Sequence, residues 1–119
     1  MDKQTRLEAV YTAFNARDVD GVLVHFGPEV DWPMAFKGGR VVGHQAVRDY
    51  WRQQWSEIDP HVEPVGFEDR GAGRVAVTIA QTVRDLEGDV VAKGEVLHVY
   101  AFDADGLVAR MDVEEPAAA

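Results

Sequence analysis

The chain has 119 residues, a formal net charge of −9 and no cysteine. This length predicts one domain over residues 1–119, with 115–119 as a flexible tail. The acidic charge argues against nucleic acid as a partner, because phosphates need a basic face. The sequence contains no run of about 18 apolar residues, so no membrane-spanning helix is predicted. The absence of cysteine excludes disulfides, and the polar start lacks the apolar core of a signal peptide, so a cytoplasmic location is expected.

The first half of the chain is predicted to be mainly helical. Apolar residues recur every three or four positions from Leu7 to Phe14, which is the spacing of one helix face. Asp18 is a residue type that caps a following helix, and Gly27 is expected to stop that helix. The expected elements are a helix at 7–14, a helix at 19–26, a strand at 29–33, a loop with a two-residue strand at 38–43 and a helix at 44–55.

Long alternating strands are predicted for the second half. One strand has an apolar face that is interrupted by Gln81, and the next carries His98 on a face shared with Tyr100. Strands that follow helices in a block indicate an α+β fold with an antiparallel sheet. The expected strands are 61–69, with a bulge or bend at Pro64 and Gly66, then 74–84, 90–102 and 107–114.

Four segments resemble a known family, namely 13–18, 26–32, 43–51 and 98–108. Their order and spacing are similar to those of the nuclear transport factor 2-like superfamily, in its SnoaL-like or ketosteroid isomerase-like branch. The resemblance implies a cone-shaped barrel, in which a strongly bent, mainly antiparallel sheet wraps around three N-terminal helices and encloses a pocket. Members include ketosteroid isomerases, polyketide cyclases, epoxide hydrolases, dehydratases and binding or assembly modules, so the fold does not settle the function.

The catalytic pattern of the ketosteroid isomerases is not retained. Those enzymes have a general-base aspartate directly before the proline that follows the first strand. In this sequence that position is occupied by Trp32. The position of their protonated aspartate is His98, and their tyrosine donor falls at about Val10, with Tyr11 beside it. In SnoaL-type cyclases a carboxylate near the pocket acts as acid or base, and Asp112 is a weak counterpart. Isomerisation by the ketosteroid mechanism is therefore not expected.

His98 and Gln81 are the candidate catalytic residues. A histidine that titrates near neutrality in a pocket can act as acid or base, whereas a neutral core histidine is bonded to a neighbour. The sequence allows both of these roles for His98. Gln81 could orient a ligand or hold one tautomer of His98, or it could be a buried amide that is satisfied locally. Asp31 is a further acid or base candidate if it is buried, and a solvated strand-edge carboxylate otherwise.

Large apolar side chains are the candidate substrate-binding residues, because they could line a pocket for a planar or greasy ligand. The alternative for each of them is ordinary core packing. The histidines lack metal-ligand spacing and no glycine-rich phosphate loop follows a strand, so neither a metal nor a cofactor is expected. The candidate substrate-binding set is Trp32, Trp51, Trp55, Tyr100 and Met111, together with the carboxylate of Asp31.

Two functions from different classes follow from these patterns. The first is a cofactor-independent isomerase, cyclase or hydrolase-like enzyme that acts on an apolar or aromatic carbonyl compound by proton transfer through His98, assisted by Gln81. The second is a non-catalytic ligand-binding or assembly domain of the same fold. A homodimer through the outer face of the sheet is also expected, because that face is too apolar to be fully solvated. Its apolar residues are Ala76, Thr78, Ala80, Leu97 and Val99.

Overall fold

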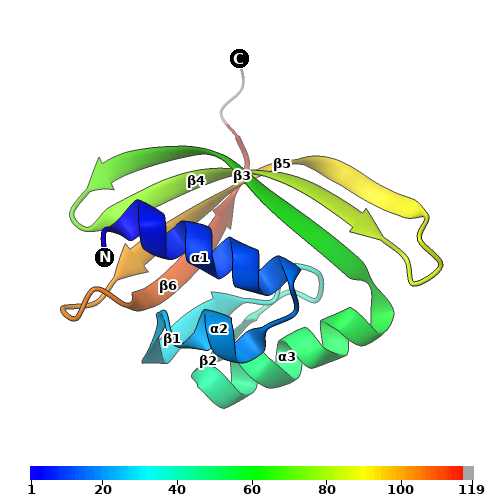
Figure 1. Ribbon diagram of the computed structural model, residues 1–119, viewed down its shortest axis with the longest axis horizontal. Coiled ribbons are helices and arrows are strands. Elements are labelled where there is room, and N and C mark those ends of the chain that lie inside the picture. Colours follow the sequence, from blue (N-terminus) through cyan, green and yellow to red (C-terminus); the bar gives the residue numbers. More distant parts are fainter. Residues whose placement is uncertain (117–119) are drawn as a thin grey trace.

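The computed structural model describes residues 1–116 and has three helices on the concave side of one curved sheet (Figure 1). The last three residues of the predicted flexible tail lie outside this range. Within it, no helix is long and apolar enough to cross a lipid bilayer. The elements are α1 (Lys3–Asn15), α2 (Val19–Leu23), β1 (Phe26–Pro33), β2 (Arg40–Val42), α3 (His44–Glu57), β3 (Asp59–Gly71), β4 (Arg74–Arg84), β5 (Val90–Phe102) and β6 (Val108–Glu114).

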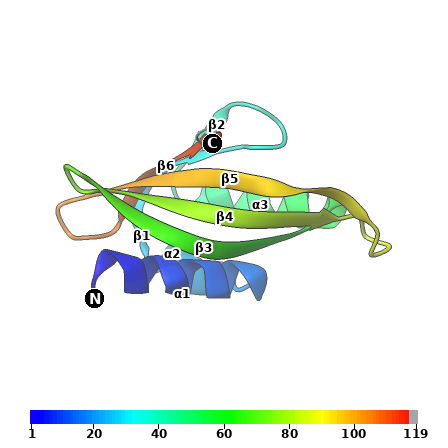
Figure 2. The same cartoon turned by 90° about the horizontal axis from the view of Figure 1, so that it is seen from above.

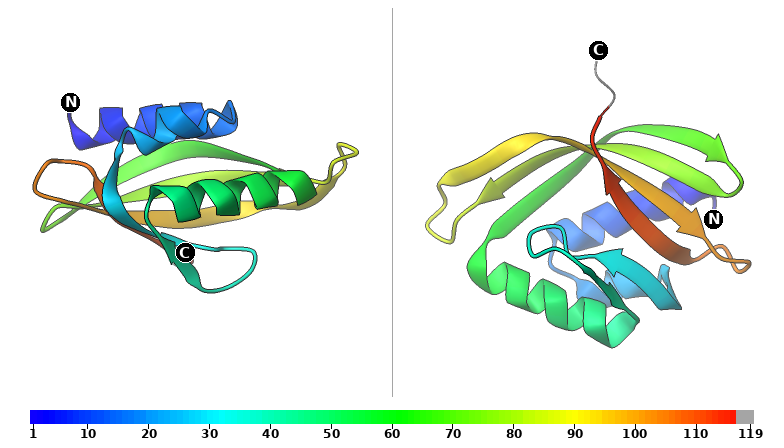
Figure 3. Two further views of the ribbon diagram at one scale, coloured as in Figure 1. Left: turned by 90° about the horizontal axis from the view of Figure 1, so that it is seen from below. Right: turned by 180° about the vertical axis from the view of Figure 1, so that it is seen from behind.

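The six strands form a single sheet in the order β2-β1-β6-β5-β4-β3. All neighbouring strands pair antiparallel except β1 and β6, which are parallel. Strands β2 and β3 remain edges, so the sheet curls around the helices without closing (Figure 3). The predicted α+β class and the strongly bent, mainly antiparallel sheet around N-terminal helices are confirmed.

Irregular pairing accompanies the bend of the long strands. The register of β3 against β4 shifts between Pro64 and Gly66, where the sequence predicts a bulge or bend. The register of β5 against β6 shifts between Ala101 and Phe102. Such bulges increase the local twist of a sheet. Figure 2 shows β3, β4 and β5 side by side as bowed ribbons, with α1 along the β3 side.

The predicted extent of the second helix was wrong at its end. Helix α2 stops at Leu23, and Phe26 begins β1 by pairing with Val108 of β6. The Phe26 ring is buried against Trp32 and Trp51, with ring centroids 5.0 and 6.0 Å away. The periodicity of the sequence is also compatible with Phe26 on a helix face. Phe26 lies in a strand instead because it pairs with β6, which is distant in sequence.

Helix α1 is capped at its start and attached to the sheet at its end. Asp2 caps its start by accepting a hydrogen bond from the backbone N–H of Thr5, at 2.7 Å. At its other end the Asn15 amide pairs with the backbone of Val62 in β3: its Nδ2 donates to the carbonyl at 2.8 Å and its Oδ1 accepts from the N–H at 3.0 Å. This two-point contact sets the rotation of α1 and therefore the direction of Tyr11, which is buried.

Candidate functional site

Two hollows lie between the helices and the concave face of the sheet, and we call them together the cavity. They share walls made by Trp32, Trp51 and His98. The first hollow extends to Tyr11 and has a cavity volume of about 40 Å³. The second extends to Phe36 and has a cavity volume of about 60 Å³. In the described part of the chain, none of the residues lining either hollow is acidic.

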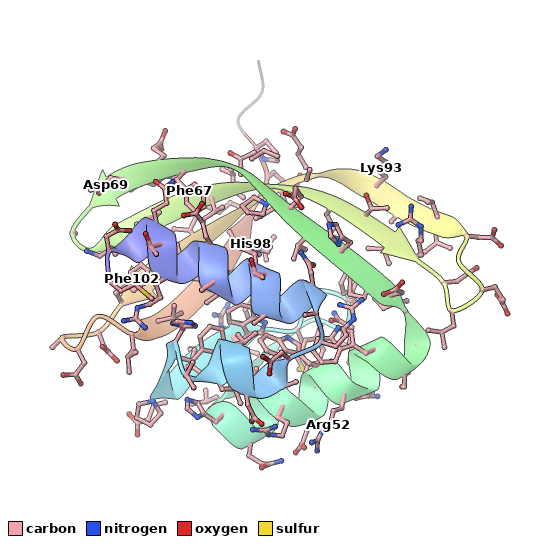
Figure 4. The ribbon with its side chains drawn as sticks, viewed as in Figure 1. Arg52, Phe67, Asp69, Lys93, His98 and Phe102 are labelled. Carbon is pink, nitrogen blue, oxygen red and sulfur yellow. The ribbon has the colours of Figure 1, made fainter. Side chains whose placement is uncertain are left out.

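A buried hydrogen-bond chain holds the one histidine of the cavity. Nδ1 of His98 lies 2.8 Å from the Tyr11 hydroxyl, and the Tyr100 hydroxyl donates to the Tyr11 oxygen, also at 2.8 Å. His98 is 8% exposed, and both tyrosines are buried. The Tyr11 ring stacks on the imidazole, with centroids 5.9 Å apart. Figure 4 shows His98 under the arch of the sheet, beside α1.

The directions of these hydrogen bonds fix the tautomer of His98. Because the Tyr11 oxygen accepts from Tyr100, its own hydrogen points to Nδ1 of His98. If Nδ1 instead donated to Tyr11, one of the two tyrosine hydroxyl hydrogens would be buried without an acceptor in the described residues, at a cost of about 1–3 kcal/mol. Nδ1 is therefore the acceptor and Nε2 carries the hydrogen. Within residues 1–116, Nε2 makes no hydrogen bond with the protein, so its N–H is free to bind a ligand.

Burial keeps all three groups of this chain uncharged at neutral pH. Burial lowers the pKa of His98 to about 4, as the apolar lining leads one to expect. Burial raises the pKa of Tyr100 well above its usual range, although its hydrogen bond to Tyr11 acts in the opposite direction. Burial, and then the neighbouring Tyr100, raise the pKa of Tyr11. The cavity thus presents a neutral imidazole whose N–H can donate to a ligand but is a weak acid.

The candidate substrate-binding residues are not all in the cavity. Trp32, Trp51 and Met111 line the second hollow, and Tyr100 lines the first. Trp55 lines neither of them. Its ring instead packs on Phe14 and Trp51 and lies under the guanidinium of Arg17, 5.1 Å from the ring centroid. For Trp55 the structure therefore favours the alternative, core packing, over contact with a ligand.

Gln81 lines the second hollow but is not the partner of His98. It pairs with Gly94 across the strands, whereas His98 pairs with Val77, four residues earlier on β4. The tautomer of His98 is instead fixed by Tyr11, from the other side of the cavity. Alternation correctly placed Gln81 and His98 on one face of the sheet, but it could not give their separation along the strands.

Asp31 and Asp112 lie on the outer face of the sheet, and neither of them lines the two hollows of the cavity. Asp31 Oδ1 accepts from Nε of Arg40 at 2.5 Å, and its Oδ2 accepts from Arg110 at 2.9 Å. Asp112 contacts the same two arginines, at 3.1 and 2.9 Å. The hydrogen bond from Arg110 lowers the pKa of the Asp112 carboxyl. Strand alternation is the reason, because neighbouring residues of a strand point to opposite faces.

Tyr11 is the site residue that sequence reasoning missed. The resemblance placed the tyrosine donor of the isomerases at about Val10, one residue earlier. Helical spacing does put Tyr11 on the buried face of α1, together with Leu7 and Val10. What the sequence could not supply was the partner, because Tyr11 and His98 are separated by 87 positions. Among the described residues, no three His, Asp or Glu side chains are grouped so that they could hold a metal ion.

Solved structures with the same fold are similar to this chain over nearly its whole length. The structure of TerC co-crystallized with polyporic acid matches with a TM-score of 0.83 at 24% identity, covering 96% of this chain and 91% of that chain. A nuclear transport factor 2-like protein of unknown function from Burkholderia pseudomallei has a TM-score of 0.83 at 26% identity, with coverages of 98% and 92%. A proposed polyketide cyclase from Sinorhizobium meliloti has a TM-score of 0.78 at 16% identity, with coverages of 96% and 100%.

Comparisons of the sequence place the chain in a family. No curated protein matches it significantly. The family described as "SnoaL-like domain" matches residues 7–111, which contain α2 and α3, the first five strands and His98 with both of its tyrosine partners. With a match over most of the sequence and the curled sheet of the solved relatives, the chain belongs to the family of SnoaL-like domains.

Proposed function

We propose that this protein binds a small aromatic carbonyl compound in the cavity and promotes its enolisation, as a cofactor-independent isomerase or cyclase would. The observation that carries the proposal is the state of His98. The residue is neutral, its Nδ1 is occupied by Tyr11, and its Nε2–H has no partner within residues 1–116. A hydrogen-bond donor in an apolar cavity is suited to an oxygen that gains negative charge during a reaction.

The proton balance favours hydrogen bonding over full transfer from His98. In enolisation a C–H bond next to the carbonyl breaks, its proton goes to water, and the electron pair forms a C=C bond while charge moves to oxygen. Nε2–H of His98 would donate to that oxygen. If His98 gave up its proton completely, Nδ1 would have to take one from Tyr11 and Tyr11 one from Tyr100. The raised pKa of Tyr100 opposes this step, because it would leave a buried phenolate.

Aromatic walls support an aromatic ligand. The first hollow is lined by the rings of Tyr11, Phe14, Trp32, Trp51 and Tyr100. Flat rings pack well against such walls in stacked or edge-on contacts. Two relatives point in the same direction: TerC was co-crystallized with polyporic acid, and the relative from Sinorhizobium meliloti is a proposed polyketide cyclase.

A non-catalytic ligand-binding domain is the second candidate function. The observation that favours it is the position of the carboxylates, since Asp31 and Asp112 bind arginines on the outer face. Without a carboxylate in the cavity, the proton from carbon has to leave through water. A binding protein would need only the shape of the cavity and the donor at His98.

Hydrogen exchange at carbon separates the two functions. Acetophenone is incubated with the protein in heavy water, and the loss of its methyl proton signal is followed by NMR. We expect exchange to be at least about 10²-fold faster than in buffer, because a donor at the carbonyl oxygen stabilises the enolate. Calorimetry on the same sample measures binding. If acetophenone binds and its exchange rate stays at that of buffer, the protein is a ligand-binding domain and the enzymatic proposal is contradicted.

We also propose that two copies pair through the outer face of β3, β4 and β5. Ala76, Thr78 and Leu97 line a shallow hollow there, with charged residues around it. A stable pair would bury about 800 Å² per subunit. Light scattering at micromolar protein should give twice the 13.2 kDa of one chain. Leu97→Lys should return the mass of one chain, and Val90→Lys, an exposed position on the same strand, should not. A mass of 13.2 kDa for the unchanged protein would contradict this proposal.

A further inference from the structure

A third hollow lies next to the cavity, between α3 and the ends of β4 and β5. It is lined by Phe36 and Lys37 before α3, by Glu57 at the end of α3, and by Val91 near the start of β5. Tyr50 and Gln54, one helical turn apart on α3, line both this hollow and the second hollow of the cavity. These two side chains therefore form a polar boundary between the cavity and the third hollow.

Gln54 has an unpaired polar atom at this boundary. Its Nε2 donates to the Tyr50 hydroxyl oxygen at 3.2 Å, while its Oε1 is buried with no hydrogen-bond partner within residues 1–116. The residue is 8% exposed. The amide can also be turned by 180°, which would pair Oε1 with Tyr50 and bring Nε2 to the present place of Oε1. A buried polar atom without a protein partner is costly, so the place beside it suits a polar group from outside the protein, such as a water or a ligand hydroxyl.

We infer that the Gln54 amide binds a hydroxyl group of the same ligand whose carbonyl oxygen accepts from His98. This inference rests on the proposed function and names its ligand class, a hydroxylated aromatic ketone. Gln54 and His98 both line the second hollow, so one ligand can lie between them. A hydroxyl group fits the amide in either orientation, because it can donate to Oε1 or accept from Nε2.

The surroundings of Gln54 favour a neutral group over a charged one. Apart from Lys37 and Glu57, the third hollow is lined by uncharged and mostly apolar side chains, including Val83 and Val91. A carboxylate of the ligand would lose its hydration there; the charges of Lys37 and Glu57 oppose each other, and the net charge of −9 would repel it. An ether in place of the hydroxyl has no hydrogen to donate and is bulkier. We therefore expect the affinity for the ligand to be highest with a hydroxyl group at this place on the ring, lower with hydrogen and lowest with a methoxy group.

Three matched ketones test this ranking by calorimetry: para-hydroxyacetophenone, acetophenone and para-methoxyacetophenone. For the unchanged protein we expect the hydroxylated ketone to bind about tenfold more tightly than acetophenone, which is the worth of one good hydrogen bond. Gln54→Leu should bring this ratio to about one, because the amide that binds the hydroxyl group is removed. Gln53→Leu, an amide on the exposed side of the same helix, should keep the preference and serves as the control.

The outcomes separate this inference from the proposed function. If acetophenone and its hydroxylated form bind equally well, or if Gln54→Leu keeps the preference, the inference is overturned and the proposed function stands. If Gln81→Leu removes the preference and Gln54→Leu does not, the hydroxyl binds at β4, and the inference is overturned as well. If none of the three ketones binds, both fail. Thermal unfolding of each variant shows that the compared proteins are folded.

Discussion

Replacing His98 with leucine is expected to slow hydrogen exchange of bound acetophenone by about 10²-fold or more. The reason is that Nε2–H of His98 is the donor that the structure leaves free for the carbonyl oxygen. The substitution also leaves the Tyr11 hydroxyl without its acceptor, so stability should fall by about 1–3 kcal/mol. Exchange rates by NMR, calorimetric binding and thermal unfolding are measured on the same preparation.

A conservative variant separates a role in the reaction from a role in the fold. His98→Gln retains an oxygen that can accept from Tyr11 and an N–H that can donate into the cavity. It should recover a large part of the lost stability and some of the exchange rate. If His98→Leu lowers stability but leaves binding and exchange per folded molecule unchanged, His98 is a structural residue. That result would favour the ligand-binding function.

Lowering the pH from 6.5 to 4 is expected to destabilise the protein by about 3 kcal/mol through His98 alone. The ordinary pKa of 6.5 holds in the unfolded chain, and burial lowers it to about 4 in the folded one. Between these values the unfolded state binds more protons, so the free energy of unfolding rises with pH. The contribution is complete above pH 6.5 and is lost progressively as the pH falls toward 4.

The His98→Gln variant isolates this effect from other titrating groups. Denaturant unfolding is measured across the range for both proteins, and the difference between the two curves is taken. Asp112 and His25, whose pKa values are also lowered in the folded state, contribute to both curves and cancel. The stability of the unchanged protein relative to the variant should fall by about 3 kcal/mol between pH 6.5 and 4, so that the variant becomes the more stable protein. Parallel curves would mean that His98 titrates alike in the folded and unfolded chains and is not desolvated.

The sequence alone determined the class of fold and most of its elements. Strands β4 and β5 have the predicted bounds, because strict alternation over many residues leaves one face for the core and one for the outside. Asp18 caps α2 as its residue type suggested, by accepting from the N–H of Gly21 at 3.0 Å. The irregular pairing between Pro64 and Gly66 was also predicted from residue type, because proline and glycine both disturb a strand. These features depend on neighbours in sequence, where spacing is fixed by covalent geometry.

The chemistry of the cavity was decided by the tertiary structure. The sequence placed His98 on the inner face, but the pairing with Tyr11 depends on the rotation of α1, which Asn15 sets through β3. The unpaired oxygen of Gln54 likewise exists only because α3 packs it away from water. Side-chain partners are chosen by distances across the fold, and a small rotation of one helix changes them. Local patterns therefore predicted the face of the sheet on which His98 and Gln81 lie, and packing between distant segments decided which other residues line the cavity and which atoms remain free for a ligand.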